Sequence, residues 1–148
     1  MSVNPEILAA WQGALAAEQQ AAFGYALLGP HLPGARQDLA RSCQALHEQL
    51  RDDTADAIAA AGATPQAPPG DYPALYGVPP LELAPQLEDD CAAAWRFYYA
   101  ALAQSGGTAG QRAVAQRGLT GSAVRSTRWR ILAGRGPAVV AFPGTTRS

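Results

Sequence analysis

The sequence of 148 residues has no lysine, and all 11 of its basic residues are arginines. Against 12 acidic residues they leave a formal net charge of −1, which does not support nucleic acid binding. There are only two cysteines, and no CxxC pair, so the usual dithiol and zinc motifs are excluded. Cys43 and Cys91 fall on apolar helical stripes, where we expect free thiols packed as small hydrophobic side chains.

Long apolar runs are also missing, because no stretch approaches the ~18 residues needed to span a bilayer. No charged segment followed by an apolar one opens the chain, so we expect a soluble, cytoplasmic protein without membrane contact. The G-x-S-x-G, G-x-x-x-x-G-K and H-E-x-x-H motifs are absent, and His47-Glu48 lacks the second histidine of the last one. These absences exclude the common hydrolase, nucleotide-binding and zinc-protease signatures.

What the sequence has in abundance is alanine, within a chain that is 48% hydrophobic and 16% charged. This composition favours closely packed helices, so we predict an all-α fold. The length suits one domain over residues 1–148. Capping residues and apolar spacing predict four helices, at residues 5–28, 35–61, 81–104 and 109–132, followed by an extended tail at 134–148.

The connections predict how these helices are arranged. Residues 31–34 and 105–107 are too short for anything but an antiparallel turn. The proline-rich stretch 63–80 could extend over about 60 Å, whereas a helix of about 25 residues is about 38 Å long, so it can return along the whole bundle. The third helix is then parallel to the second. In the tail, Val139, Val140 and Phe142 must cover apolar surface, and we favour the chain's own bundle over a neighbour.

The apolar spacing also predicts which residues each helix buries. On the first helix they are Trp11, Leu15, Ala22 and Tyr25, and on the second Leu39, Cys43, Leu46, Leu50, Ala57 and Ile58. On the third they are Leu87, Cys91, Ala94, Trp95, Tyr98 and Leu102, and on the fourth Val114, Leu119, Val124 and Ile131.

One carboxylate, Glu18, interrupts the apolar stripe of the first helix, and a buried acid needs a partner. His47 lies at a similar depth on the second helix and Glu88 on the same side of the third, so we expect Glu18 and His47 within hydrogen-bond or shared-ligand reach. Arg51, one turn beyond His47, is a candidate to reach the same site. On the fourth helix, Arg125 or Arg128 is placed to neutralise the acids, with exposure of both arginines as the alternative.

Two short turns and one long crossover describe the ferritin-like bundle, in which carboxylates and Glu-x-x-His pairs hold two metals. Here Gln44 stands where the second helix needs an acid, and the fourth helix has no Asp, Glu or His. We therefore expect no di-iron centre. A single iron or manganese ion held by Glu18, His47 and Glu88 remains an alternative.

Five segments resemble a known family. They are AAEQQAAFGYALLG around Glu18, HEQLRDD from residue 47, LEDDCAAAWR from residue 87, AVRSTRW from residue 123 and AFPG from residue 141. In this order they resemble a small ferritin-like domain of unknown function from high-GC, actinobacterial-type bacteria. The resemblance implies a ferritin-like four-helix bundle and no established reaction. Relatives often have His after the first-helix Glu and an acid early in the fourth-helix motif, where this chain has Gln19 and Gly121.

Three functions remain open. We favour a non-catalytic binding or structural bundle with no cofactor, whose polar core is neutralised by arginine. The alternatives are the single-metal site and a small-molecule pocket lined by Trp11, Tyr25, Trp95 and Tyr98. Alanine-rich helix faces and the apolar tail favour a homodimer; the sequence identifies no other protein partner.

Overall fold

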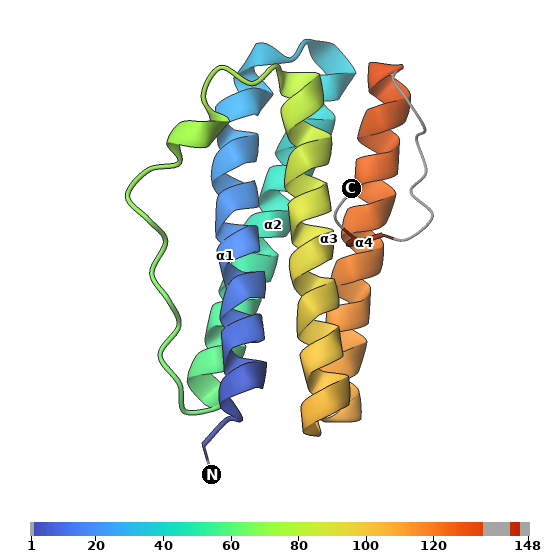
Figure 1. Ribbon diagram of the computed structural model, residues 1–148. Helices are drawn as coiled ribbons and strands as arrows, with labels where there is room; N and C mark the ends of the chain where they lie inside the picture. Colours follow the sequence, from blue (N-terminus) through green and yellow to red (C-terminus); the bar gives the residue numbers. More distant parts are fainter. Residues whose placement is uncertain (1, 135–142, 146–148) are drawn as a thin grey trace.

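Four long helices make up most of the computed structural model, which describes residues 2–134 and 143–145 (Figure 1). They are α1 (Pro5–Leu28), α2 (Gly34–Ala60), α3 (Pro80–Ser105) and α4 (Ala109–Ala133), with short 3₁₀ turns at Gly29–His31 and Pro73–Leu75. The described residues contain no strand. The predicted all-α fold is confirmed, and each predicted helix end lies within one residue of the observed one.

Local capping explains these helix ends. The Asn4 side chain accepts hydrogen bonds from the backbone N–H groups of Glu6 and Ile7, at 2.9 and 3.3 Å, and so starts α1. At α4, the side chains of Thr108 and Gln111 each accept from the other's backbone N–H, which forms a capping box. Gly106 ends α3 with a φ of 82°, in the left-handed region that favours glycine.

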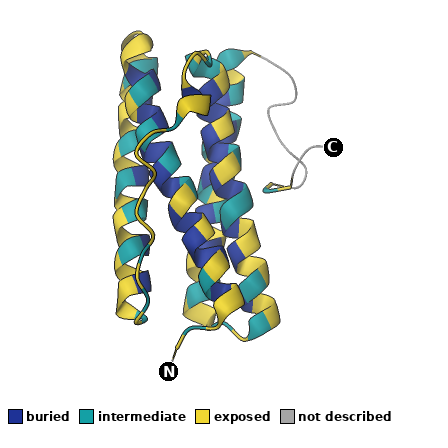
Figure 2. Cartoon of the chain, turned by 60° about the vertical axis from the view of Figure 1, so that its left-hand side comes forward, coloured by how far each residue is buried: buried dark blue, intermediate teal, exposed yellow. Residues whose placement is uncertain are grey.

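The helices form two antiparallel pairs joined by a long crossover (Figure 1). As predicted, the crossover returns along the bundle and leaves α3 parallel to α2. It is mostly exposed in Figure 2, yet it is held to α1 by side chains. Gln12 donates to the Thr64 carbonyl at 2.8 Å and accepts from the Gln66 backbone N–H at 2.9 Å, and Gln19 donates to the Gln66 carbonyl at 2.9 Å.

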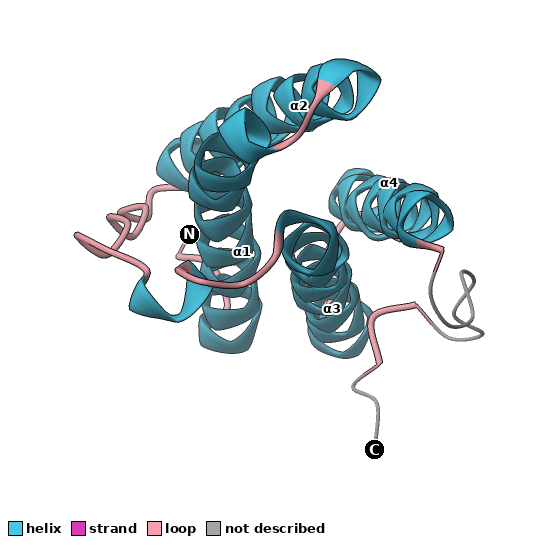
Figure 3. Ribbon diagram, turned by 90° about the horizontal axis from the view of Figure 1, so that it is seen from above, coloured by secondary structure: helices cyan, strands magenta, loops and turns pink. Residues whose placement is uncertain are grey.

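Packing between the helices is uneven. Helix α1 packs against α2 and α3, and α3 packs against α4, whereas α2 and α4 hardly approach each other. Seen from above, the helices follow one another around the bundle in the order α2, α1, α3, α4 (Figure 3). The side of the bundle between α2 and α4, here called the open side, is therefore the one on which neighbouring helices pack least. No described helix has the length and apolar character required to cross a bilayer.

The predicted inward face of α4 is wrong. Val114, Val124 and Ile131 are exposed and Leu119 is half-buried, while α4 buries small residues and one tryptophan instead: Ala115, Gly118, Ser122, Ser126 and Trp129. A Cβ atom on Gly118 would lie 2.5–2.7 Å from the Trp95 ring, so the bulky indole of α3 requires a minimal residue opposite it. The size of the partner's side chain, and not the hydrophobicity of α4, selects this face.

Smaller corrections apply to two other helices. On α2, Leu46 and Ala57 are exposed, and on α3, Ala94 is half-buried. The tail residues Val139, Val140 and Phe142 lie outside the described residues. Gly144 does lie against α3 of its own chain, because a Cβ there would be 2.8 Å from the Ala92 carbonyl oxygen.

Candidate functional site

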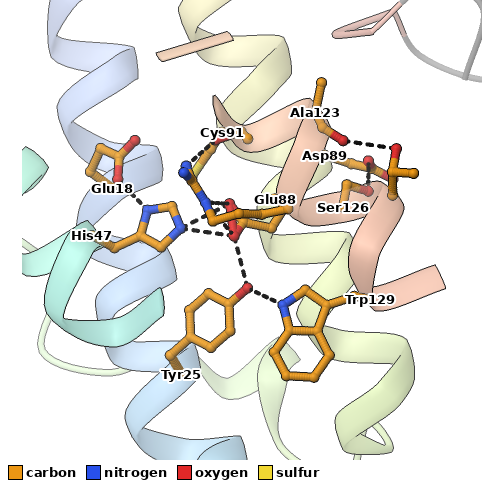
Figure 4. Close-up of polar contacts among 12 residues, drawn as sticks. Glu18, Tyr25, His47, Glu88, Asp89, Cys91, Ala123, Ser126 and Trp129 are labelled. Carbon is orange, nitrogen blue, oxygen red and sulfur yellow. Dashed lines mark hydrogen bonds and ion pairs between the residues drawn. The ribbon is translucent and has the colours of Figure 1, made fainter. Parts of the chain in front are cut away.

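Three helices bring one ionisable side chain each to the centre of the bundle (Figure 4). Glu18 of α1, His47 of α2 and Glu88 of α3 are fully buried. His47 Nδ1 lies 2.5 Å from Glu18 Oε2, and His47 Nε2 lies 2.8 Å from Glu88 Oε1. The structure thus brings together the three residues that the sequence singled out.

The imidazole of His47 is held between two carboxylates. A neutral imidazole has one N–H and one lone pair, so one of its nitrogens would face a carboxylate lone pair without a proton. Burial alone would lower the pKa of His47, but the hydrogen bonds and negative charges of Glu18 and Glu88 outweigh burial and raise this pKa to about 9. The ring is therefore an imidazolium at neutral pH.

Helix α4 contributes the second positive charge. Arg125 Nε donates to Glu88 Oε1 and Oε2 at 3.1 and 3.0 Å, and Arg125 Nη2 donates to Ser122 Oγ at 3.1 Å. Burial would raise the pKa of Glu88, but the hydrogen bond from His47 and the charges of His47 and Arg125 lower it. Of the two arginines predicted on this helix, the structure thus places Arg125 at the acids.

The other two predicted charge partners lie elsewhere. Arg128 is exposed. At its level of α4 the inward position is occupied by its neighbour Trp129, which is fully buried. Arg51 bonds its neighbour Asp52 at 2.8 Å on the surface, where both side chains are more than a third exposed. The prediction that Arg51 reaches the site is wrong, because a short-range surface pair competes for its guanidinium.

Three neutral donors complete the network, and two of them, Tyr25 and Trp129, are drawn in Figure 4. The Trp95 indole N–H donates to Glu18 Oε1 at 2.8 Å. The Tyr25 hydroxyl donates to Glu88 Oε2 at 2.8 Å and accepts from the Trp129 indole N–H at 2.8 Å. Every carboxylate oxygen of the two glutamates therefore accepts at least one hydrogen bond.

The charges balance within this network, since two carboxylates face one imidazolium and one guanidinium. Burying an unpaired charge is very unfavourable, and removing one partner of a buried pair is strongly destabilising. Among the described residues, the one buried side-chain polar atom without a hydrogen bond is the Tyr72 hydroxyl, outside this network. The site is thus electrically neutral and saturated with hydrogen bonds.

A metal ion would find partly suitable donors here. One ligand atom each from Glu18, His47 and Cys91 lie within 4.8 Å of one another. However, the Cys91 thiol donates to the Ala17 carbonyl at 3.4 Å, and burial raises its pKa well above the usual value. An ion would have to displace protons from both the thiol and the imidazolium.

The two-metal pattern of ferritin-like proteins does not fit these residues. Where that pattern requires ligands on the fourth helix, α4 presents Arg125. Gln44 on α2 donates to Glu48 Oε1 at 3.0 Å and is not part of the core network.

The aromatic residues predicted to line a pocket are packed core instead. Trp11 stacks on Tyr98 with ring centroids 5.6 Å apart, and Tyr25 stacks on His47 at 5.5 Å. Trp95 is also buried. A groove of about 780 Å³ lies on the outside between α3 and α4, and none of these four aromatic residues lines it.

Sequence reasoning missed a second polar cluster, between α3 and α4 (Figure 4). Ser126 Oγ donates to Asp89 Oδ1 at 2.6 Å, and Arg130 forms an ion pair with Asp89 and donates to Ser126 Oγ at 2.7 Å. The available signal was the pair Ser126 and Arg130, which are four residues apart on the helix antiparallel to α3.

Comparison with known proteins places the chain among others without an assigned activity. A family model described as "Domain of unknown function (DUF4439)" matches residues 10–147. The crystal structure of a conserved hypothetical protein from Mycobacterium tuberculosis is similar, with 30% sequence identity and a TM-score of 0.79. That match covers 88% of this chain and 99% of the other one. No protein with a curated description matches.

Proposed function

The chain belongs to the DUF4439 family of domains of unknown function, and we propose that it is a non-catalytic binding or structural bundle of ferritin-like descent. In this proposal, a permanent internal charge network occupies the position at which ferritin-like proteins hold metal. The observation that carries the proposal is Arg125, whose guanidinium lies 3.0 Å from Glu88 Oε2 on the helix that would otherwise supply metal ligands.

Three features support a structural role for the network over a reactive one. Its three central side chains have no exposed surface, so a substrate would have no direct approach to them. Its protons are already committed to short hydrogen bonds, which leaves no free base or nucleophile. It also joins all four helices, since α1, α2, α3 and α4 each contribute a charged member.

The alternative is a single iron or manganese ion bound by Glu18, His47 and Glu88, and it rests on the position of His47 next to both carboxylates, each of which faces a different ring nitrogen. Two carboxylates and one imidazole suit either ion chemically. Arg125 opposes this alternative, because its positive charge repels a cation from Glu88. The proposal and the alternative therefore differ in one measurable property, the metal content.

The test is elemental analysis of protein purified without chelator from medium supplemented with iron and manganese. The Glu18→Gln variant is the matched control, because it removes one proposed ligand with almost no change of shape. We expect far less than one ion per chain in both proteins and the same thermal midpoint with and without EDTA. About one ion per chain in the wild type, lost in the variant and by chelation, would overturn the proposal in favour of the metal site.

A further inference from the structure

The open side of the bundle carries apolar residues that the monomer leaves uncovered. On α2, Leu46 is 40% exposed and Leu39 and Leu50 are half-buried. They share a face with Cys43. Burial raises the pKa of the Cys43 thiol, and Arg125 and Trp129 of α4 lie close enough to lower it in part. This face of α2 is therefore the one turned toward α4.

Helix α4 presents a matching face. Val114, Gly121, Arg125, Arg128 and Leu132 recur at spacings of seven, four, three and four residues, which puts them on one side of the helix. Val114 is 43% exposed, while Arg125 points from this side to the buried acids. The α2 wall of the open side thus exposes leucines and the α4 wall exposes Val114 beside arginines, although these helices hardly touch within the monomer.

The two walls carry opposite charge. Helix α4 has no acidic residue, and two of its arginines, Arg117 and Arg128, lie exposed on the face that holds Val114. On α2, Asp53 is exposed seven residues beyond Leu46 and so lies on the face of the leucines, within a helix that has five acidic residues against three arginines. A surface with one acidic and one basic wall complements a copy of itself when the copy is turned so that each acidic wall meets a basic one.

Heights along the helices can be matched from one contact. Arg36 Nη2 donates to the Leu132 carbonyl at 3.3 Å, which fixes the level of α2 relative to the antiparallel α4. At about 1.5 Å per residue, Leu46 and Gly121 both lie about 15–17 Å below that level. Asp53 lies about 25 Å and Arg117 about 23 Å below that level, so these two residues are also at nearly the same height.

We infer that the open side is a homodimer interface, in which α2 of each copy packs against α4 of the other around a two-fold axis parallel to the helices. This rotation keeps heights unchanged, so Leu46 of one copy lies level with Gly121 of the second, beside the Arg125 side chain. Asp53 of one copy then lies near Arg117 of the second. A two-fold axis perpendicular to the helices would instead set each α4 against its own copy, and Arg117 and Arg128 would face the same two arginines of the copy.

The inference does not depend on what the core holds, so it can fail while the proposed function stands. Sedimentation velocity and light scattering over about 1–100 μM measure the mass, which is 15.4 kDa for one chain. We expect a dimer of twice that mass for the wild type. Leu46→Glu and Arg117→Glu should each weaken the dimer at least tenfold, with unchanged helical circular dichroism.

Two further variants make the assignment specific. Asp53→Arg alone should weaken the dimer, and the double variant Asp53→Arg, Arg117→Glu should restore it, because the charge pair is exchanged. Phe97→Glu is the matched control, since Phe97 is 68% exposed on α3, away from the open side, and this change should leave the dimer intact. A wild type that is monomeric at 100 μM would overturn the inference. So would a dimer disrupted by Phe97→Glu but not by Leu46→Glu.

Discussion

Replacing Glu18 by glutamine changes the protonation of the core with almost no change of shape. In the wild type, Glu18 accepts two hydrogen bonds, from the Trp95 indole at 2.8 Å and from His47 Nδ1 at 2.5 Å. A glutamine side chain has one acceptor oxygen and one donor nitrogen. Its oxygen can keep the Trp95 bond, but its nitrogen must donate to His47 Nδ1, which then carries no proton. The variant therefore loses one negative charge and one proton, and the core stays neutral.

The size of the effect follows from the pKa of His47, which rises from 6.5 to about 9 in the folded protein. A group whose pKa is raised on folding stabilises fully below its unfolded pKa, and this stabilisation is lost as the pH rises through its folded pKa. At about 1.4 kcal/mol per pKa unit, the contribution is about 3 kcal/mol. Wild-type stability should fall by about 2–3 kcal/mol between pH 6 and pH 9. The Glu18→Gln variant should stay level or rise by up to about 1 kcal/mol, because its unfolded chain takes up a proton on His47 near pH 6.

Urea denaturation followed by circular dichroism at pH 6, 7, 8 and 9 measures this difference. Burial also raises the pKa of Cys43 and of Cys91, and both thiols lower stability at alkaline pH. They are present in both proteins, so their effect cancels when the two pH profiles are subtracted. Parallel profiles for wild type and variant would refute the imidazolium assignment.

Two further predictions test packing and charge by thermal and urea unfolding. Gly118→Ala should destabilise by about 1–3 kcal/mol, because the new methyl would lie 2.5–2.7 Å from atoms of the Trp95 ring, whereas Gly13→Ala, with open space around it, should stabilise by about 0.5–1 kcal/mol. Equal effects at the two glycines would contradict the packing argument. Arg125→Leu should destabilise by about 2–4 kcal/mol, since it leaves Glu88 short of a positive partner, while the exposed Arg128→Ala should change stability by less than about 0.5 kcal/mol. An Arg125→Leu protein as stable as Arg128→Ala would show that the pair contributes nothing.

Helix positions and their arrangement could be predicted because local signals determine them. Asn4, Gly106 and the proline-rich crossover act through their own backbone conformations, which do not depend on distant partners. The depth of Glu18 and His47 followed from helix geometry in the same way.

The inward face of α4 could not be predicted because it depends on another helix. Periodicity favours apolar residues such as Val114 and Ile131, but Trp95 of α3 requires glycine at position 118 and leaves those apolar residues outside. Likewise, Arg51 and Arg125 are the same residue type, and the sequence alone does not say which of them reaches the core. A local partner, Asp52, holds Arg51 at the surface, whereas Arg125 pairs with Glu88. Such choices depend on three-dimensional neighbours that a single sequence does not specify.

The central claim is that His47 is an imidazolium held between two carboxylates in a core that needs no metal. Nitrogen NMR of ¹⁵N-labelled His31→Gln protein, in which His47 is the remaining histidine, observes both ring nitrogens directly. The account predicts that both carry protons at pH 7.5 and that the ring titrates with a pKa of about 9. A neutral imidazole at pH 7.5, with one nitrogen unprotonated, would contradict it.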